Sequence, residues 1–446
     1  MVLDPVEKKQ IFYIKKSLSL LKGKKKNIDT GINPGCYLSS WADEIGLLTL
    51  KSYSSISFSE KSKLILKYFY KHINFSDIIV NHTSLKNKNY KRLIVSWGDH
   101  TDIKKNSFHD KYFSKNCKDK QNTLWLIITS ENDFHKIKSK DNNLILVTNK
   151  KNFLIPILKN IDGLFKLVFK NDLPSKLHAL RIPNFYVKLS AIILNYIKEK
   201  KISEILMPYE CQPFQHYIFK DVKKFSNSIK TIGYIHSALT PLPTDFIARS
   251  NHPDKIIVHG NGQKKILTNF LNWNKKNIIF RPSARFLKRK KKRFTNKIIL
   301  PMSFQKENQI LENFEFYLNS QESKTLHPFK IQNHPNMTDS KKHKDLITNL
   351  EKILFKYKNK FKDSSRKKIS IFIAATAAII EALEEGTKVI HIFSDPIFES
   401  HSKVFWRDIN IKKINRNTSE YSMPKKSKFI VFGKKYKKID KWLKKI

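Results

Sequence analysis

Glycine is scarce in this chain, with 11 residues in 446, and neither GxGxxG nor GxxxxGK[ST] occurs. Those glycine-rich motifs form the phosphate loops of dinucleotide-binding and P-loop proteins. Their absence argues against both classes of protein.

Cysteine is rarer still. Cys36, Cys117 and Cys211 are odd in number, lie far apart and form no CxxC pair. The sequence therefore supports neither a disulfide framework nor a cysteine-based zinc site, and it indicates a reducing compartment. HExxH and Asp-x-Asp are also absent. We expect no metal site, and in particular no metal-chelated nucleotide-sugar site.

Long apolar runs are missing. The longest mostly apolar stretch, 369–380, is too short to span a bilayer. Residues 1–9 include four charged residues and are not followed by the apolar region of a signal peptide, so we expect none. We expect a cytoplasmic protein that is soluble or peripheral on the inner membrane.

Acidic residues are few: 38 Asp and Glu face 86 Lys and Arg, which gives a formal net charge of +48. Only ten of the cations are arginine, although arginine is the better residue for bidentate phosphate or base recognition. The abundant Lys, Ile, Asn and Phe share AT-rich codons, so genome composition explains part of the charge. The charge favours an anionic partner of open type. A nucleic-acid-binding protein remains an alternative, although lysines spread along the chain argue against it.

The length suggests two or three domains, and 40% hydrophobic and 12% aromatic residues exclude a mostly disordered chain. Short apolar, β-branched runs alternate with longer helical patterns, which predicts βαβ units and mainly parallel sheets. The predicted strands are 92–96, 124–129, 144–148, 204–207, 231–236, 255–259, 297–302, 329–332, 369–374, 388–393 and 429–432. The predicted helices are 60–71, 186–200, 263–271, 346–357, 377–385 and 435–445.

The sharpest change of composition is the basic run 287–294, which directly precedes a predicted strand. A charge run of this kind does not fit inside a folded sheet. We therefore predict an N-terminal α/β domain over 1–286, a basic linker over 287–294 and a C-terminal α/β domain over 295–446. Two parallel-sheet domains facing a cleft would place ligands at the C-terminal ends of strands from both halves.

Segment 369–392 is typical of a strand, a turn, a short helix, a glycine stop and a second strand. Small residues at the turn, including Ala375, let an anion approach the free N–H groups of the helix, and Thr376 is the expected N-cap. Glu381, one turn further, could accept hydrogen bonds from ribose hydroxyls, and Gly386 occupies the expected C′ position. An ordinary crossover packed with alanines fits the same pattern.

Two further polar residues follow predicted strands of this half. His334 precedes a proline at a strand end, where an imidazole could hydrogen-bond a phosphate or a leaving-group oxygen. Ser303 follows the first strand and could face the same cleft. Surface-loop positions without a function are the alternative for both residues.

In the N-terminal half, Glu210 follows a short apolar strand, and a carboxylate there can act as a base or a nucleophile. A solvated glutamate fits equally well. His236 and Ser237 end the next strand, and Gly233 inside that strand indicates close approach of another part of the chain.

Upstream, acids and aromatics gather around another strand end. Asp99 and Asp110, with Trp97 and Trp125, could line an acceptor site. Packing of the two tryptophans in the core is the alternative.

Four segments together resemble the GT-B glycosyltransferases of bacterial surface-carbohydrate synthesis, above all the capsule and lipopolysaccharide transferases that use CMP-linked sugars such as sialic acids or Kdo. FKIQNHP (329–335) is similar to the His-Pro motif of that group. ATAAIIEALEEGTKVI (375–390) is similar to its Ser/Thr-rich turn followed by Glu-Ala-Leu and Gly. PYECQPFQHYIF (208–219) and IGYIHSAL (232–239) resemble the N-domain pattern of surface-carbohydrate proteins of marine bacteria.

The resemblance implies two Rossmann-like parallel-sheet domains facing a cleft. It implies metal-independent transfer, without a cofactor, from a nucleotide-sugar donor (a CMP-linked ulosonic acid) to a surface-glycan or lipid-linked glycan acceptor. The donor would bind to the C-terminal domain and the acceptor to the N-terminal one. The implied donor residues are Ser303, His334, Ala375, Thr376 and Glu381, the implied catalytic residues are Glu210 and His236, and the acceptor-side residues are Asp99, Asp110 and Ser237.

The phosphate turn departs from that group, because Thr376 supplies its only hydroxyl where relatives often carry two. Backbone N–H groups must then contribute more, or the donor differs. A sugar-nucleotide epimerase of the same fold, which needs no acceptor, is a second enzymatic interpretation.

The C-terminal segment 434–446 places Trp442 and Leu443 on one apolar helical face, with lysines elsewhere. A basic amphipathic helix can lie on an anionic membrane surface, which would suit a lipid-linked acceptor. The alternative, which we prefer, is a terminal helix that packs its apolar face on the N-terminal half.

Overall fold

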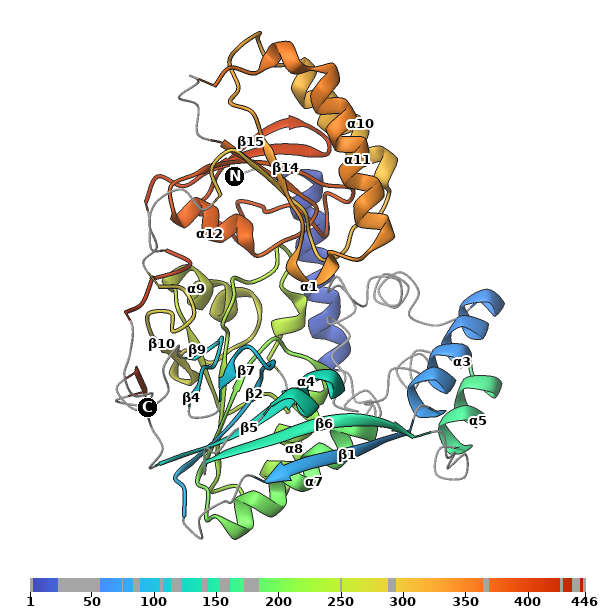
Figure 1. Ribbon diagram of the computed structural model, residues 1–446, viewed down its shortest axis with the longest axis vertical. Helices are drawn as coiled ribbons and strands as arrows, with labels where there is room; N and C mark the ends of the chain where they lie inside the picture. The colour runs from blue at the N-terminus through green and yellow to red at the C-terminus, as the bar shows by residue number, and fades with distance from the viewer. Residues whose placement is uncertain are drawn as a thin grey trace.

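The computed structural model describes residues 3–22, 57–73, 75–82, 89–104, 107–113, 122–137, 143–152, 161–171, 184–248, 251–287, 294–363, 369–425, 428–434 and 442–443. These residues form two large β-sheets with helices around each (Figure 1). Cys36 and Cys117 lie outside the described residues, and the Cys211 thiol is buried.

The first sheet has eight strands in the order β1-β6-β5-β2-β7-β8-β9-β10. β1 is antiparallel to β6, and the other pairings are parallel. Numbered along the chain, the parallel strands lie in the order 3-2-1-4-5-6-7, which begins as a Rossmann sheet does. The strands are β1 (Phe75–His82), β2 (Arg92–Trp97), β5 (Thr123–Thr129), β6 (Leu144–Asn152), β7 (Glu204–Pro208), β8 (Lys230–Tyr234), β9 (Lys255–Val258) and β10 (Ile278–Phe280).

Sequence patterns predicted six of these eight strands and missed β1 and β10. The helices of this half are α1 (Pro5–Lys22), α3 (Phe58–Ile73), α4 (Glu131–Lys136), α5 (Ile161–Phe169), α7 (Asn184–Glu199), α8 (Pro213–Phe225) and α9 (Asn261–Phe270). Helices α3, α7 and α9 were predicted. Helix α8 was not, although Pro213 stands in its first turn and the Gln215 side chain accepts a hydrogen bond from the Gln212 amide, as in a capping box. This half also contains a two-stranded ribbon of β3 (Ile103–Lys104) and β4 (Ser107–Phe108). Two 3₁₀ turns belong to it as well, η4 (Thr244–Phe246) and η5 (Lys275–Asn277).

The second sheet has six strands in the order β12-β11-β13-β14-β16-β15. The first four are parallel, and the β15–β16 hairpin adds to β14 antiparallel. The strands are β11 (Lys297–Ile299), β12 (Lys330–Gln332), β13 (Ile369–Ile373), β14 (Lys388–Ile392), β15 (Asn410–Asn415) and β16 (Thr418–Ser422). The helices are α10 (Glu307–Asn319), α11 (Lys341–Lys356) and α12 (Ala378–Glu384), with 3₁₀ turns η6 (Pro335–Met337) and η7 (Lys358–Lys360).

Both faces of this second sheet are covered, as its continuous apolar strands require. Ile371 and Ile390 pack in one apolar cluster with α10 and α11, whereas Phe372 and Val389 pack in the other with α12. Figure 1 shows α12 on the opposite side of the sheet from α10 and α11. The expected α/β class with two Rossmann-like, mainly parallel sheets is confirmed.

Two predictions need correction or completion here. Residues 429–432 form no strand; the chain there crosses to the first half, where the Val431 amide donates to the His259 carbonyl at 2.6 Å. The β15–β16 hairpin was not predicted, because its mostly polar residues lack the apolar pattern of the other strands.

Both ends of the described chain cross between the halves. In α1, the Gln10 side chain donates to the carbonyls of Ile397 (2.8 Å) and Ser400 (3.0 Å) in the second half. At the other end, the Trp442 indole N–H donates to the Pro282 carbonyl at 2.7 Å, and its ring packs in the core of the first half. The predicted linker lies between the last strand of one sheet and the first of the other, and its residues 288–293 lie outside the described residues.

Candidate functional site

In an open parallel sheet, ligands bind beyond the C-terminal strand ends at the point where the strand order reverses. In the first sheet this switch point lies between β2 and β7. Aromatic side chains gather there: the Trp97 ring lies 6.2 Å from that of Tyr112 and 5.8 Å from that of Phe214. Trp97 is only half-buried, whereas Trp125 is a core residue.

Glu210 and His236 meet at this edge. They follow the neighbouring parallel strands β7 and β8, and His236 Nε2 lies 2.9 Å from Glu210 Oε1. On the other side of the imidazole, Arg285 Nη1 donates to His236 Nδ1 at 2.8 Å. Because a guanidinium only donates, Nδ1 must be the unprotonated nitrogen, and Nε2–H then donates to the carboxylate. The geometry therefore defines a neutral, oriented histidine.

The electrostatics agree with this protonation state. Burial lowers the pKa of His236, and the charge of Arg285 lowers it further against the pull of Glu210. Partial desolvation opposes ionisation of Glu210, yet the hydrogen bond from His236 and the charge of Arg285 bring the pKa of Glu210 below its usual value. The His236 side chain is 5% exposed and that of Glu210 is 50% exposed. A charged carboxylate thus reaches solvent from a buried support.

Arg285 is held in place by its loop. The Tyr234 hydroxyl accepts from the amide of Ala284 at 3.0 Å, and the Ser283 amide donates to Val431 in the returning chain at 2.8 Å. The guanidinium lies 5.7 Å from the centroid of the Tyr112 ring. Sequence reasoning missed this residue, although an arginine in a chain that strongly prefers lysine was an available signal.

The strand that carries His236 is closely packed against its neighbours. A Cβ on Gly233 would lie 2.8 Å from the Tyr209 ring, which confirms the close approach expected for that glycine. The Ser237 carbonyl accepts from His259 Nε2 (3.1 Å) and Gln263 (3.0 Å), so Ser237 is tied to the next strand and helix.

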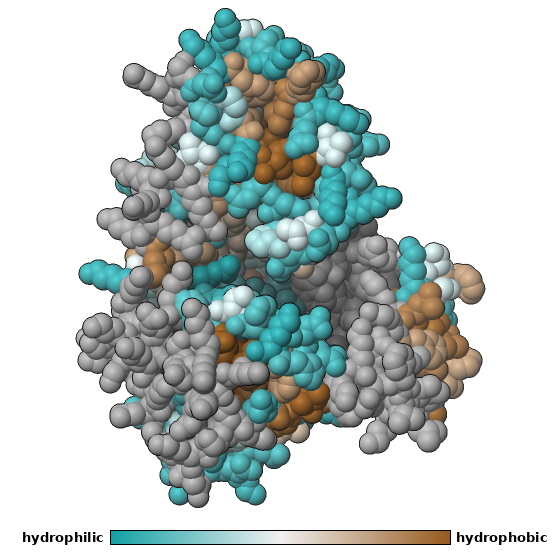
Figure 2. All heavy atoms as spheres, in the orientation of Figure 1, coloured by the Kyte–Doolittle hydropathy of each residue, from teal (hydrophilic) through white to brown (hydrophobic). Residues whose placement is uncertain are grey.

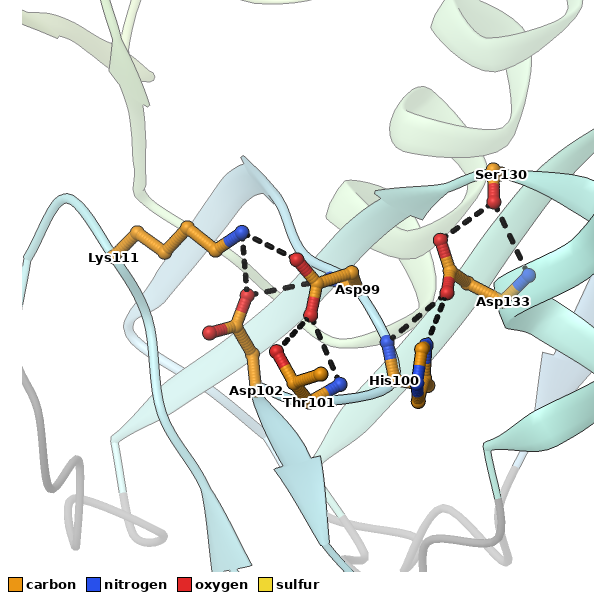
Figure 3. A network of polar contacts seen from close by, with 7 residues as sticks. All are labelled: Asp99, His100, Thr101, Asp102, Lys111, Ser130 and Asp133. Atoms are coloured by element: carbon orange, nitrogen blue, oxygen red, sulfur yellow. Dashed lines mark hydrogen bonds and ion pairs between the residues drawn. The ribbon is translucent and has the colours of Figure 1, made fainter. Parts of the chain in front are cut away.

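Asp99 belongs to an ionic network at the end of β2 (Figure 3). Lys111 bridges Asp99 and Asp102, and Thr101 donates to Asp99. Although partial burial opposes it, the ion pair with Lys111 and the bonds from Thr101 lower the pKa of Asp99 to about 2. Beside it, His100 pairs with Asp133. The network keeps Asp99 charged at the rim of the switch point.

Asp110 points inward. It is 1% exposed, and its Oδ1 accepts from the amides of Tyr112 and Phe113, both at 2.8 Å. Burial raises the pKa of Asp110 to about 6 in spite of these bonds. Its carboxyl group orders the loop that carries Tyr112.

The switch point of the second sheet lies between β11 and β13. Ser303 follows β11, Ala375 and Thr376 follow β13, and His334 follows β12, the neighbour of β11. The Asn336 amide donates to His334 Nδ1 at 3.2 Å, and burial lowers the pKa of His334. The neutral ring then carries its proton on Nε2, where it can donate to an anionic oxygen.

The turn after β13 differs from the sequence-based expectation in the residue that caps helix α12. Helix α12 begins at Ala378 with Ala377 as its cap, so the prediction of Thr376 as the N-cap is wrong by one residue. The Thr376 hydroxyl accepts from the Ala378 amide at 3.3 Å. The helix has only 7 residues, and its N-terminus alone makes no anion site. Glu381 is 8% exposed. Gly386, with φ 83°, is the expected left-handed terminator.

Ala374 adds an unpredicted feature to that turn. Its φ of 50° is unusual for a residue with a side chain. His391 Nε2 donates to the Ala374 carbonyl at 2.8 Å, and burial lowers the pKa of His391 to about 4. The neutral His391 ring therefore holds Ala374 in its strained conformation at the switch point.

The described part of the chain contains neither a cluster of metal-binding side chains nor a membrane-spanning helix. Within those residues, no three His, Cys, Asp or Glu side chains form a group that could hold a metal ion. None of the helices in that same part of the chain has the length and apolarity needed to cross a membrane.

No protein-family model matches the chain, and no curated protein matches it. Among solved structures, the chain is similar to a glycosyltransferase from Rickettsia africae ESF-5, with a TM-score of 0.30 and 12% identity over 68% of this chain and 79% of that one. A likeness of this size does not identify a shared fold or activity.

Proposed function

We propose that the protein is a glycosyltransferase that moves a sugar from a nucleotide-activated donor to a glycan acceptor. One observation carries the proposal. Each of the two Rossmann-like sheets has its switch point flanked by polar residues that the sequence singled out: Glu210 in the first sheet, Ser303 and Thr376 in the second. One such site suits a nucleotide and the other suits an acceptor.

On the first sheet, Glu210 is the candidate base. Its carboxylate takes the proton of the acceptor hydroxyl while that oxygen forms a bond to the anomeric carbon, and the nucleotide leaves with the electron pair of the broken bond. His236 holds one carboxylate oxygen by its Nε2–H, and Arg285 fixes the histidine from behind. Both act as positioning residues in this scheme.

On the second sheet, His334 is the candidate donor to the leaving phosphate. Ser303, Thr376 and the backbone at Ala375 are the other candidate contacts to that phosphate. The proposal assigns neutralisation of the leaving group to these groups and needs no metal or cofactor. Glu381 remains the candidate contact to the nucleoside. The CMP-linked ulosonic acid donor and a surface-glycan or lipid-linked acceptor rest on the sequence resemblance of segments 329–335 and 375–390.

A thermal-shift series tests the proposal first. CMP-, UDP-, GDP- and CDP-linked sugars, each with and without EDTA, should include one that raises the melting temperature in both conditions, because a ligand of the folded state stabilises it. Absence of any shift at millimolar donor would overturn the proposal. Stabilisation that EDTA abolishes would overturn its metal-independent form.

Product analysis then separates the reactions. A transferase releases nucleotide and extends a glycan only when acceptor is present, whereas an epimerase of the same fold changes the donor alone. The nucleic-acid alternative predicts binding of RNA or DNA that weakens steeply with salt. That behaviour without donor binding would favour the alternative.

A further inference from the structure

The helix pair α3 and α5 presents large apolar side chains to solvent. Six of the twelve large apolar side chains that are exposed in the described residues lie on these two helices. They are Phe58 (85%), Leu66 (68%), Ile161 (48%), Phe165 (56%), Val168 (37%) and Phe169 (70%). A concentration of this kind marks an interaction surface, whereas single exposed apolar residues are ordinary.

Helix α5 shows the pattern most clearly. Ile161, Phe165, Val168 and Phe169 stand at spacings of four, seven and eight residues, which places them on one helical face. The opposite face is already in use: Leu167 is buried, and a Cβ on Gly163 would lie 2.3 Å from the Tyr68 hydroxyl of α3. The helix is therefore apolar on both its inward and its outward side.

The pair stands on the flank of the molecule. Strands β1 and β6 form an antiparallel ribbon at the sheet edge, in which Phe75 pairs with Asn152 at one end. Helix α3 precedes that end and α5 follows it, and Figure 1 shows the two helices side by side away from both sheets. In Figure 2 the apolar atoms of this flank form an exposed patch.

The positive charge around this apolar patch distinguishes between two possible partners, a second copy of the chain and an anionic bilayer. Helix α3 carries four lysines and one glutamate, and the exposed Lys170 follows α5. A second copy of this chain, itself at +48, would bring lysines against lysines. An anionic bilayer surface takes up Phe, Leu and Ile side chains at its interface while its head groups attract the surrounding lysines.

We propose that the α3–α5 pair is a docking surface for an anionic lipid bilayer. This inference goes beyond the proposed function and does not depend on it. It assigns the membrane contact to this helix pair and not to the C-terminal segment, because Trp442 is 2% exposed and packs inside the first half.

The test is flotation of the full-length protein with vesicles of phosphatidylcholine, with and without one-third phosphatidylglycerol. The wild type should float with the anionic vesicles and less with the neutral ones. The double variant Phe165→Ser and Phe169→Ser should reduce the bound fraction about tenfold, because two apolar side chains no longer insert. The matched control, Phe316→Ser and Phe355→Ser, removes equally exposed phenylalanines from α10 and α11 and should float as the wild type does.

Two results would overturn the inference. The first is flotation of the double variant like the wild type at unchanged melting temperature, which would show that lysines alone account for the binding. Alternatively, light scattering could show a wild-type dimer that Phe165→Ser and Phe169→Ser dissociates, with no vesicle binding, which would make a second copy the occupant. Both readouts are independent of sugar transfer, so failure here leaves the proposed function standing.

Discussion

His236 Nε2 lies 2.9 Å from Glu210 Oε1, and the two residues extend from neighbouring parallel strands at the edge where the strand order of the first sheet reverses. Arg285 donates to the far nitrogen of the same ring. The imidazole is therefore held from both sides, and the carboxylate that it supports stays ionised while reaching solvent. This arrangement makes the roles of the three residues separable by experiment.

Glu210→Gln should lower sugar transfer at least about 100-fold, the usual contribution of a general base, while donor affinity changes little. Initial rates and calorimetric donor binding check this. Glu399→Gln alters a carboxylate of the second half, and its rate of sugar transfer is compared with that of Glu210→Gln. Unchanged turnover in Glu210→Gln would remove that residue from the mechanism.

Arg285→Met should raise the pKa of His236, because the variant removes both the nearby positive charge and the donor to Nδ1. Histidine NMR signals followed across pH measure the shift. Arg285→Lys keeps the charge without the planar fork and should move the pKa of His236 less. A titration of His236 that is identical in Arg285→Met and the wild type would contradict the assigned geometry.

His334→Ala should weaken donor binding about tenfold, the usual effect of losing one hydrogen bond to a charged group. His327→Ala, in the chain just before β12, is the matched control and should bind donor as the wild type does. Equal donor affinities in the two variants would exclude a role for His334 in the donor site.

Asp110→Asn should stabilise the protein near neutral pH. Burial raises the pKa of Asp110 from 3.8 to about 6, so the folded state binds its proton more tightly than the unfolded state does. The stability from this proton is fully present below pH 3.8 and is lost as pH rises through about 6. The loss amounts to up to about 3 kcal/mol.

Urea denaturation of Asp110→Asn and the wild type between pH 4 and pH 8 checks this. The difference between the two free energies of unfolding isolates Asp110 from Glu399, whose pKa burial raises to about 7. A difference that is constant with pH would show that Asp110 does not titrate as described.

Trp442→Ala should destabilise the fold by about 3–5 kcal/mol, because a buried indole leaves both a cavity and an unpaired Pro282 carbonyl. Phe355→Ala, at a 74% exposed side chain, should change stability by no more than about 0.5 kcal/mol. Denaturation midpoints compare the two variants. A Trp442→Ala protein as stable as Phe355→Ala would contradict the packing of the C-terminal segment on the first half.

Several features of the fold followed from local sequence. Apolar runs such as 124–129 and 369–374 predicted buried parallel strands, because a strand covered on both faces needs continuous apolar side chains. The ends of the predicted strands 204–207, 231–236 and 297–302 also placed Glu210, His236 and Ser303 at strand ends. The β15–β16 hairpin had no such signal, because its strands are mostly polar.

Local sequence patterns were enough to predict the α/β class and the polar residues that end its strands, because both depend on a few neighbouring residues. The folded structure was needed to show which strands lie side by side, and hence where the two switch points fall. It also brought Arg285 to His236 across 49 positions, returned Trp442 to the first half and left the α5 face in solvent. Strand order and long-range contacts depend on the packing of whole layers, so no local pattern contains them.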